Sequence, residues 1–236
     1  MKPAARRLLV PTLMTIAMMI VLVGLGTWQT QRLAWKQDIL ARIAKAEIQP
    51  PIPLPEDPPA FAKVAVTGTL LMDKAALYGA DVRITPSGPT MGARQIVPLR
   101  RPDGRVILVD RGWVPLERTG PMPPPPDPVT VAGYIRMGDH PGWFSATDDP
   151  AARRFFTLDP AAIGAATGFP AVPPFILVLL APQPGPEPAI VTKWPEPAFH
   201  EPRPSNNHLA YAITWYGLAL TLLIIFAVWA LKGRTS

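Results

Sequence analysis

The sequence predicts a membrane protein in which two terminal transmembrane helices flank one β-rich extracytoplasmic domain. The 236-residue chain has an apolar segment of about 20 residues near each end, and neither segment contains Asp, Glu, Lys or Arg. A helix needs about 20 residues to cross a hydrocarbon layer of ~30 Å. Between these segments, short β-branched or alternating runs are separated by turn-forming residues. This pattern favours an antiparallel sheet, a sandwich or a partly closed barrel.

The N-terminal quarter is predicted to be an anchor followed by a spacer. We expect a cytoplasmic N-terminus over residues 1–7 and a transmembrane helix over residues 8–28. The apolar stretch is longer than the roughly 7–15 residues of a signal-peptide core, and it lacks an A-x-A cleavage signal, so we expect it to stay uncleaved. Residues 29–60 are expected to continue the helix amphipathically to Glu47 and then to form a Pro-rich linker.

Residues 61–195 are predicted to form the β-rich domain. The expected strands are Lys63–Leu70, Ala76–Tyr78, Arg94–Leu99, Arg105–Val109, Val129–Ile135, Phe175–Leu180 and Ile190–Trp194. Arg101-Pro102-Asp103-Gly104 is a strong turn signal, so we expect the strands on either side of it to form a hairpin. Asp159–Gly168 is predicted to be a short helix capped by Asp159, with Pro160 at its first position.

The C-terminal region is predicted to return the chain to the cytoplasm. We expect a loop over residues 196–208, a transmembrane helix over residues 209–231 and a cytoplasmic end over residues 232–236. Cytoplasmic flanks collect Lys and Arg. The basic flanking residues are Lys2, Arg6, Arg7, Lys232 and Arg234. This predicts a double-pass protein with both termini cytoplasmic and the main domain in a periplasm or an equivalent compartment.

Composition narrows the functional classes. Five of the 23 Lys and Arg residues lie in the flanks, which leaves 23 − 5 = 18 against 17 Asp and Glu. The loop is therefore nearly neutral, and we expect membrane lipid but no nucleic acid as a partner. The absence of Cys excludes c-type haem attachment and Cys-ligated iron–sulfur clusters. No hydrolase, zinc-protease or nucleotide-binding motif occurs, so we expect no enzyme and no catalytic residue.

Residues at the outer ends of the two predicted membrane helices form a candidate binding site. At about 100° per residue, His208, Tyr211 and Trp215 fall on one arc of the second helix, together with small residues. Packing of the helices through small faces would bring this arc near the first helix. The result is an aromatic slot with one potential iron ligand and one cation for a carboxylate. The candidate residues are His208, Trp28, Gln29, Arg32, Tyr211 and Trp215.

Plainer interpretations of these residues stay open. Trp and Tyr at a membrane boundary form an aromatic belt, and Asn206 and Asn207 are typical helix caps. His140 and His200 lie in loops, where a solvated imidazole is the simplest interpretation. An envelope enzyme that uses Asp110 and Arg111 with a loop His is the least supported hypothesis.

Three sequence blocks resemble the signature blocks of the Surfeit locus protein 1 family. They are Gly26–Lys36, Val109–Pro115 and Asn206–Ala219, and their order and spacing agree with the two terminal helices. The chain is similar to a bacterial member of this family. Within the second block, the role of Arg111-Gly112-Trp113 is less clear. Its simplest interpretation is a structural corner in which Arg111 satisfies backbone carbonyls.

The resemblance implies an assembly factor for cytochrome c oxidase. Family members assist haem a insertion into the catalytic subunit, so the implied partners are that subunit and haem a synthase. The implied cofactor is haem a as transient cargo, with the histidine of the last block, His208, as the iron contact. The alternative is a scaffold that stabilises an oxidase assembly intermediate and binds no haem.

Overall fold

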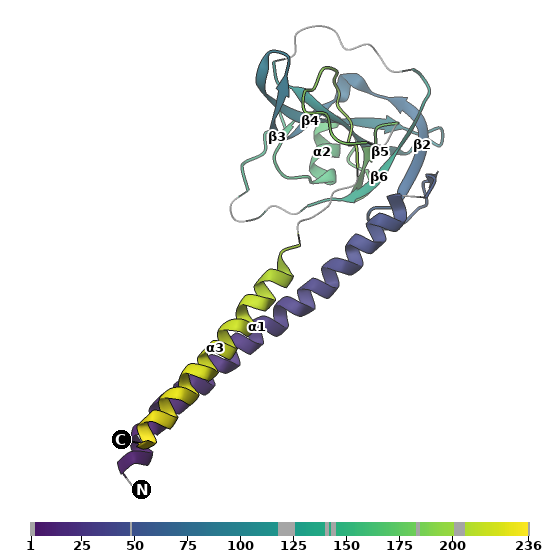
Figure 1. The fold of residues 1–236 in the computed structure, drawn as a ribbon. Coiled ribbons are helices and arrows are strands. Elements are labelled where there is room, and N and C mark those ends of the chain that lie inside the picture. The colour runs from purple at the N-terminus through teal and green to yellow at the C-terminus, as the bar shows by residue number, and fades with distance from the viewer. Residues whose placement is uncertain are drawn as a thin grey trace. The chain divides into compact units, whose positions relative to one another are not determined.

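A computed structural model describes residues 3–47, 49–117, 126–139, 142, 145–182, 185–200 and 206–235 (Figure 1). The chain divides into two compact units. One unit combines Met1–Arg42 with Arg203–Ser236, and the other is Ile43–Pro202.

The first unit is a pair of long helices. Helix α1 covers Pro3–Glu47 and helix α3 covers His208–Thr235, and they lie side by side (Figure 1). Within them, Leu9–Ala41 and His208–Lys232 are long and apolar enough to cross a membrane. The prediction of an apolar helix at each end is confirmed, and so is the continuation of the first helix to Glu47. Both findings are compatible with a double-pass membrane protein.

The second unit is built on one eight-stranded sheet. Its strands are β1 (Ile52–Pro53), β2 (Lys63–Leu70), β3 (Ala76–Thr85), β4 (Gly88–Arg100), β5 (Val106–Pro115), β6 (Val129–Met137), β7 (Arg154–Phe155) and β8 (Phe175–Leu179). They are arranged in the order β1-β2-β6-β8-β5-β4-β3-β7. Strand β2 also pairs with β4 at Thr69↔Arg100 and Leu70↔Leu99, so the sheet curls back on itself. The β-rich fold class is confirmed, with parallel pairs at β5–β8, β1–β2 and β3–β7 among antiparallel ones.

The predicted hairpin turn and helix cap are confirmed, but one predicted strand is absent. The β4–β5 hairpin closes with Gly104 N–H donating to Arg101 O at 2.9 Å. Helix α2 (Pro160–Thr167) is capped by the Asp159 carboxylate, which accepts from Ala161 and Ala162 N–H. The prediction of a strand at Ile190–Trp194 is wrong. Prolines at both ends break any ladder there, and among the described backbone bonds of this stretch one, Val191 N–H to Ile84 O, reaches the sheet.

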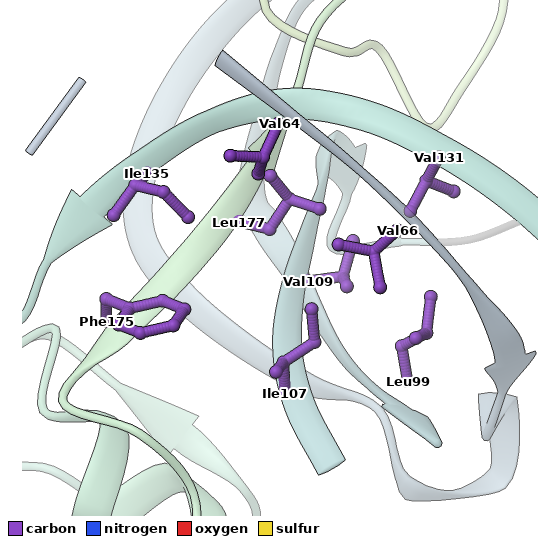
Figure 2. Close-up of a cluster of buried hydrophobic side chains, with 9 residues drawn as sticks. All are labelled: Val64, Val66, Leu99, Ile107, Val109, Val131, Ile135, Phe175 and Leu177. Atoms are coloured by element: carbon purple, nitrogen blue, oxygen red, sulfur yellow. The ribbon is translucent and has the colours of Figure 1, made fainter. Parts of the chain in front are cut away.

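Two apolar clusters cover the two faces of the sheet. The first lies inside the curl, where alternate side chains of five strands point toward one another (Figure 2). Its members are Val64, Val66, Leu99, Ile107, Val109, Val131, Ile135, Phe175 and Leu177. Leu108 belongs to the second cluster, which includes Ile163 from α2. Strand β5 is therefore buried on both faces. By alternation, Arg111 continues the inner series of Ile107 and Val109, and Asp110 the outer one.

Candidate functional site

His208 is held at the start of α3 by a polar residue of α1. Its Nδ1 lies 2.7 Å from Gln29 Oε1. The amide oxygen of Gln29 can only accept a hydrogen bond, so Nδ1 is the donor in this contact. Gln29 is buried and His208 is half-buried. The second ring nitrogen, Nε2, has no hydrogen-bond partner among the residues that the structure describes. A neutral imidazole fixed through Nδ1 is the arrangement in which Nε2 can bind a metal ion.

Aromatic rings and one cation line the α1 side of this site. The Trp28 and His208 rings meet edge to face, with centroids 6.5 Å apart. The Arg32 guanidinium lies 5.7 Å from the Trp28 ring centroid and 5.3 Å from that of Trp35. Arg32 has an exposed side chain and no carboxylate partner in the described part of the chain. It is therefore a cation available to an anionic group beside the rings.

Small residues bring the two helices together below the site. Ala212 and Ala219 on α3 are 2% and 4% exposed, and Leu22 and Gln29 on α1 are 8% and 9% exposed. Each pair is spaced by seven residues, the repeat of a helix–helix seam. Gly26 lies against the Tyr216 ring, where a Cβ would come 2.8 Å from Cε1.

The structure brings together four of the six candidate residues: His208, Gln29, Trp28 and Arg32. Tyr211 is 55% exposed and Trp215 is half-buried. In the described part of the chain, neither makes a ring contact with His208. Sequence reasoning missed Tyr216, whose hydroxyl lies 3.3 Å from Thr27 Oγ1. The glycine facing it, Gly26, was the available signal.

The block Asp110–Trp113 is the polar centre of the β-rich unit. Asp110 is fully buried, and its Oδ2 accepts from Arg94 Nε at 2.5 Å while its Oδ1 accepts from Gly112 N–H at 2.9 Å. Burial lowers the pKa of Arg94, but the adjacent Asp110 carboxylate outweighs this and the net shift is upward. Trp113 and Glu196 exchange two backbone hydrogen bonds of 2.8 Å. The block thus joins β5 to the chain segment around Glu196.

The expected role of Arg111 at this corner is wrong. Its Nη1 donates to Gln95 Oε1 at 3.3 Å and contacts Met72 Sδ at 3.1 Å. Among the described residues, no backbone carbonyl accepts a hydrogen bond from the Arg111 guanidinium. The residue of this block whose side chain does bond a backbone carbonyl is Trp113, whose Nε1 donates to Asp81 O at 3.1 Å. The inner-face position of Arg111 turns it away from the corner. His140, the first loop histidine, lies outside the described residues.

Comparison with known proteins decides the family. The SURF1 family pattern matches residues 16–220 of this chain. The chain belongs to the SURF1 family. It is 29% identical to a SURF1-like protein of Monosiga brevicollis, over 91% of this chain and 85% of that protein. It is 27% identical to Surfeit locus protein 1 of Homo sapiens (89% and 74% covered) and of Mus musculus (83% and 67% covered).

The match confirms the resemblance read from the three sequence blocks. The SURF1 pattern includes the whole first block, the whole second block and the last block as far as Ala219. The bacterial origin is not borne out, since the relatives named here are eukaryotic. Family membership and the two apolar helices support a membrane protein.

Gly26 of the first SURF1 block provides a test of the helix seam. We expect Gly26→Leu to force the Tyr216 ring aside and to separate the helices near His208, because overpacking a tight contact costs about 1–3 kcal/mol. Since the chain has no Cys, a Gln29→Cys/His208→Cys pair can be joined by a short thiol cross-linker. Gly26→Leu should lower the cross-linking yield severalfold. Gly24→Leu is the matched control, because nothing lies within 4 Å of a Cβ there; equal yields would show that the seam is misplaced.

Glu196 is expected to make the stability of the β-rich unit of this SURF1 protein depend on pH. It is 5% exposed, and neither carboxylate oxygen has a hydrogen-bond partner among the described residues. Burial raises its pKa; the Glu187 and Asp81 charges add to the shift, and Arg83 and Arg94 oppose it. Below the unfolded-state pKa, both states are protonated and the group has no effect. As the pH rises from the unfolded-state pKa toward the folded-state pKa, the carboxyl ionises first in the unfolded state, so the folded state loses stability. Above the folded-state pKa, the loss is complete and no longer changes with pH.

We therefore expect Glu196→Gln to raise the melting temperature at neutral pH and to have little effect at about pH 4, near the ordinary Glu pKa. Thermal unfolding of the full chain in detergent at the two pH values measures the difference between variant and wild type. If the melting temperatures of variant and wild type differ by the same amount at both pH values, ionisation of the buried Glu196 carboxylate does not cost stability. Glu56→Gln is the control and should change the melting temperature little at either pH, because its carboxylate is exposed, pairs with Arg105 and is not among the charges that shift the pKa of Glu196.

Proposed function

We propose that this SURF1 family member is an assembly factor for cytochrome c oxidase that binds haem a as transient cargo at His208. The observation that carries the proposal is the imidazole itself. Gln29 holds Nδ1, and Nε2, beside Trp28, has no partner among the described residues. Neutral imidazole is a common axial ligand of haem iron.

The residues around His208 fit the other requirements of haem a. A porphyrin needs flat apolar walls, which Trp28 provides on α1 and which Trp215 and Tyr211 would extend on α3. Its propionates need a cation, and Arg32 is exposed beside Trp28. A single half-buried ligand binds less firmly than a pair of axial ligands, and this suits a carrier that must release its cargo. No enzymatic activity is part of the proposal.

We infer from the flanking charges that both termini are cytoplasmic and that the β-rich unit is periplasmic, in a bacterial inner membrane. Lys and Arg flank both apolar segments on the terminal side. An export-dependent reporter inserted after Gly120 should be active in this topology. A reporter that works only in the cytoplasm, if active at the same place, would reverse it.

The second candidate function is a scaffold that stabilises an oxidase assembly intermediate without haem. The contact between α1 and α3 favours this alternative, because the His208–Gln29 hydrogen bond links the two helices whether or not haem is present. Under both functions, the catalytic subunit of the oxidase and haem a synthase are the proposed partners.

A deletion strain tests the oxidase assignment. Without this protein, we expect oxidase with a lowered haem a content and lower activity, while the other respiratory complexes keep their activity. Restoring the wild-type gene should restore both values. Normal haem a content and turnover in a deletion strain that has no second copy of the gene would reject the assignment.

A further inference from the structure

A pocket of about 810 Å³ opens in the β-rich unit beside the end of β8. Its volume falls within the roughly 300–1,000 Å³ typical of small-molecule sites. Strand β6 forms one wall around Val131, and the chain after β8 forms another around Leu180. The segment that includes Pro195, Pro197 and Phe199 closes a third side.

Backbone pairing fixes these walls. Beyond the end of β8, Ala181 N–H donates to Ala198 O at 2.7 Å, and Ala198 N–H donates to Leu179 O at 3.0 Å. Proline contributes rings but no N–H donor, and four prolines line the pocket. The walls are therefore held in place by the sheet and are mostly aliphatic, with Phe199 as the aromatic lining residue among those described.

Arg111 gives this apolar pocket a positive end. Its Nη1 is used by Gln95 and Met72, and the other guanidinium N–H groups have no acceptor among the described residues. No described carboxylate pairs with Arg111, and burial lowers its pKa. The Lys and Arg residues that line the pocket are Lys63 and Arg111, and no described Asp or Glu is among its lining residues. Arg111 is half-buried, so an anionic acceptor that enters the pocket would displace only part of a water shell and would gain charge-assisted hydrogen bonds.

We propose that this pocket binds an amphipathic anion, with its carboxylate or phosphate on Arg111 and an acyl-type chain along the walls of Val131, Leu180 and Phe199. The sign of the lining charge selects the head group, and a planar guanidinium matches carboxylate and phosphate oxygens. Aliphatic walls favour an acyl chain over a stacked aromatic ring. The proposal concerns a site in the β-rich unit and does not rest on haem binding at His208.

A free fatty carboxylate and an anionic phospholipid share this chemistry, and photolabelling separates them. The full chain in phosphatidylcholine nanodiscs is exposed to one of three diazirine probes: a dodecanoate, a phosphatidylglycerol or a phosphatidylcholine. Labelled peptides are then identified by mass spectrometry. We expect labelling of peptides that contain Leu179–Pro182 and Pro195–Phe199 by one or both anionic probes, and at least about tenfold less by the zwitterionic probe. Dodecanoate alone would indicate a free carboxylate as the ligand, and phosphatidylglycerol would indicate a phospholipid.

Variants test the assigned contacts. Arg111→Gln should lower pocket labelling about tenfold, the effect of one charge-assisted hydrogen bond, and Arg111→Lys should restore part of it. Ala181→Trp places a large ring in the pocket wall, leaves the Arg111 residue itself unchanged and should abolish labelling. Arg136→Gln is the control, because Arg136 bonds Tyr78 and Asp139 and does not line this pocket.

Peptides from α1 and α3 serve as an internal standard for contact with bulk lipid. Pocket labelling that is equal for charged and zwitterionic probes would overturn the proposal, and so would its absence from wild type while α1 and α3 are labelled. Labelling unchanged in both Arg111→Gln and Ala181→Trp would also overturn it. If Arg111→Gln fails to fold, Ala181→Trp and the comparison of probes on wild type decide the question.

Discussion

Gly112→Ala is expected to cause the largest loss of stability of the single substitutions considered. Gly112 has φ = 118°, in the region that glycine alone adopts readily, and a Cβ there would lie 1.9 Å from the Glu196 carbonyl oxygen. The Glu196 segment would have to move, which breaks both of its backbone hydrogen bonds with Trp113. Strain of about 1–3 kcal/mol adds to these losses. We expect the melting temperature of the full chain to fall by about 10 °C or more.

Gly104→Ala separates the two causes of this effect. Gly104 also has a positive φ, 82°, but nothing lies within 4 Å of a Cβ there. It should therefore show only the cost of a left-handed backbone, about 1–2 kcal/mol. Circular dichroism during heating measures both variants. Equal falls in melting temperature would mean that the close approach of Glu196 to Gly112 contributes nothing.

Asp110→Ala should have the second-largest effect. The substitution leaves the Arg94 guanidinium without its counter-charge and removes the acceptor for Gly112 N–H. Removing one partner of a buried ion pair costs about 3–5 kcal/mol, because the other charge stays desolvated. For a unit of this size, this corresponds to a fall of roughly 10 °C in melting temperature.

Asp103→Ala is the matched control for Asp110→Ala. Asp103 also pairs with arginine, but it does so in the exposed hairpin turn, where ion pairs contribute little. We expect only a small fall in melting temperature, from loss of the Arg105 N–H bond that Asp103 Oδ1 accepts in the turn. A fall as large as that of Asp110→Ala would show that burial is not what makes the Asp110–Arg94 pair important.

Much of the fold follows from local patterns. The Asp159-Pro160 cap and the Arg101–Gly104 turn each specify their element within a few residues. The parallel β5–β8 pair and the β2–β4 contact join residues far apart in the chain, so no short-range pattern encodes them. Ile190–Trp194 shows the reverse case, because its composition suits a strand but its place in the fold offers no ladder.

The candidate site could be predicted only in part. The apolar pattern placed Trp28 and Arg32 at the outer end of the first helix, and His208 stood out as an imidazole at a membrane boundary. The bond from His208 to Gln29 depends on the rotation of each helix against the other, which the periodicity of a single helix does not set. Tyr216 was missed for this reason. The burial of Asp110 and Glu196 was also unforeseen, since charged residues after an apolar run usually mark a strand that has reached solvent.

The absorption spectrum of the purified full chain, from cells that make haem a, tests the central claim most directly. Wild type should carry haem a, and His208→Ala should lose most of it or show a shifted Soret band, because alanine offers no iron ligand. His200→Ala, which removes a histidine of the β-rich unit, should match wild type. A His208→Ala protein that binds haem a with unchanged spectrum and affinity would contradict the account and favour the scaffold function.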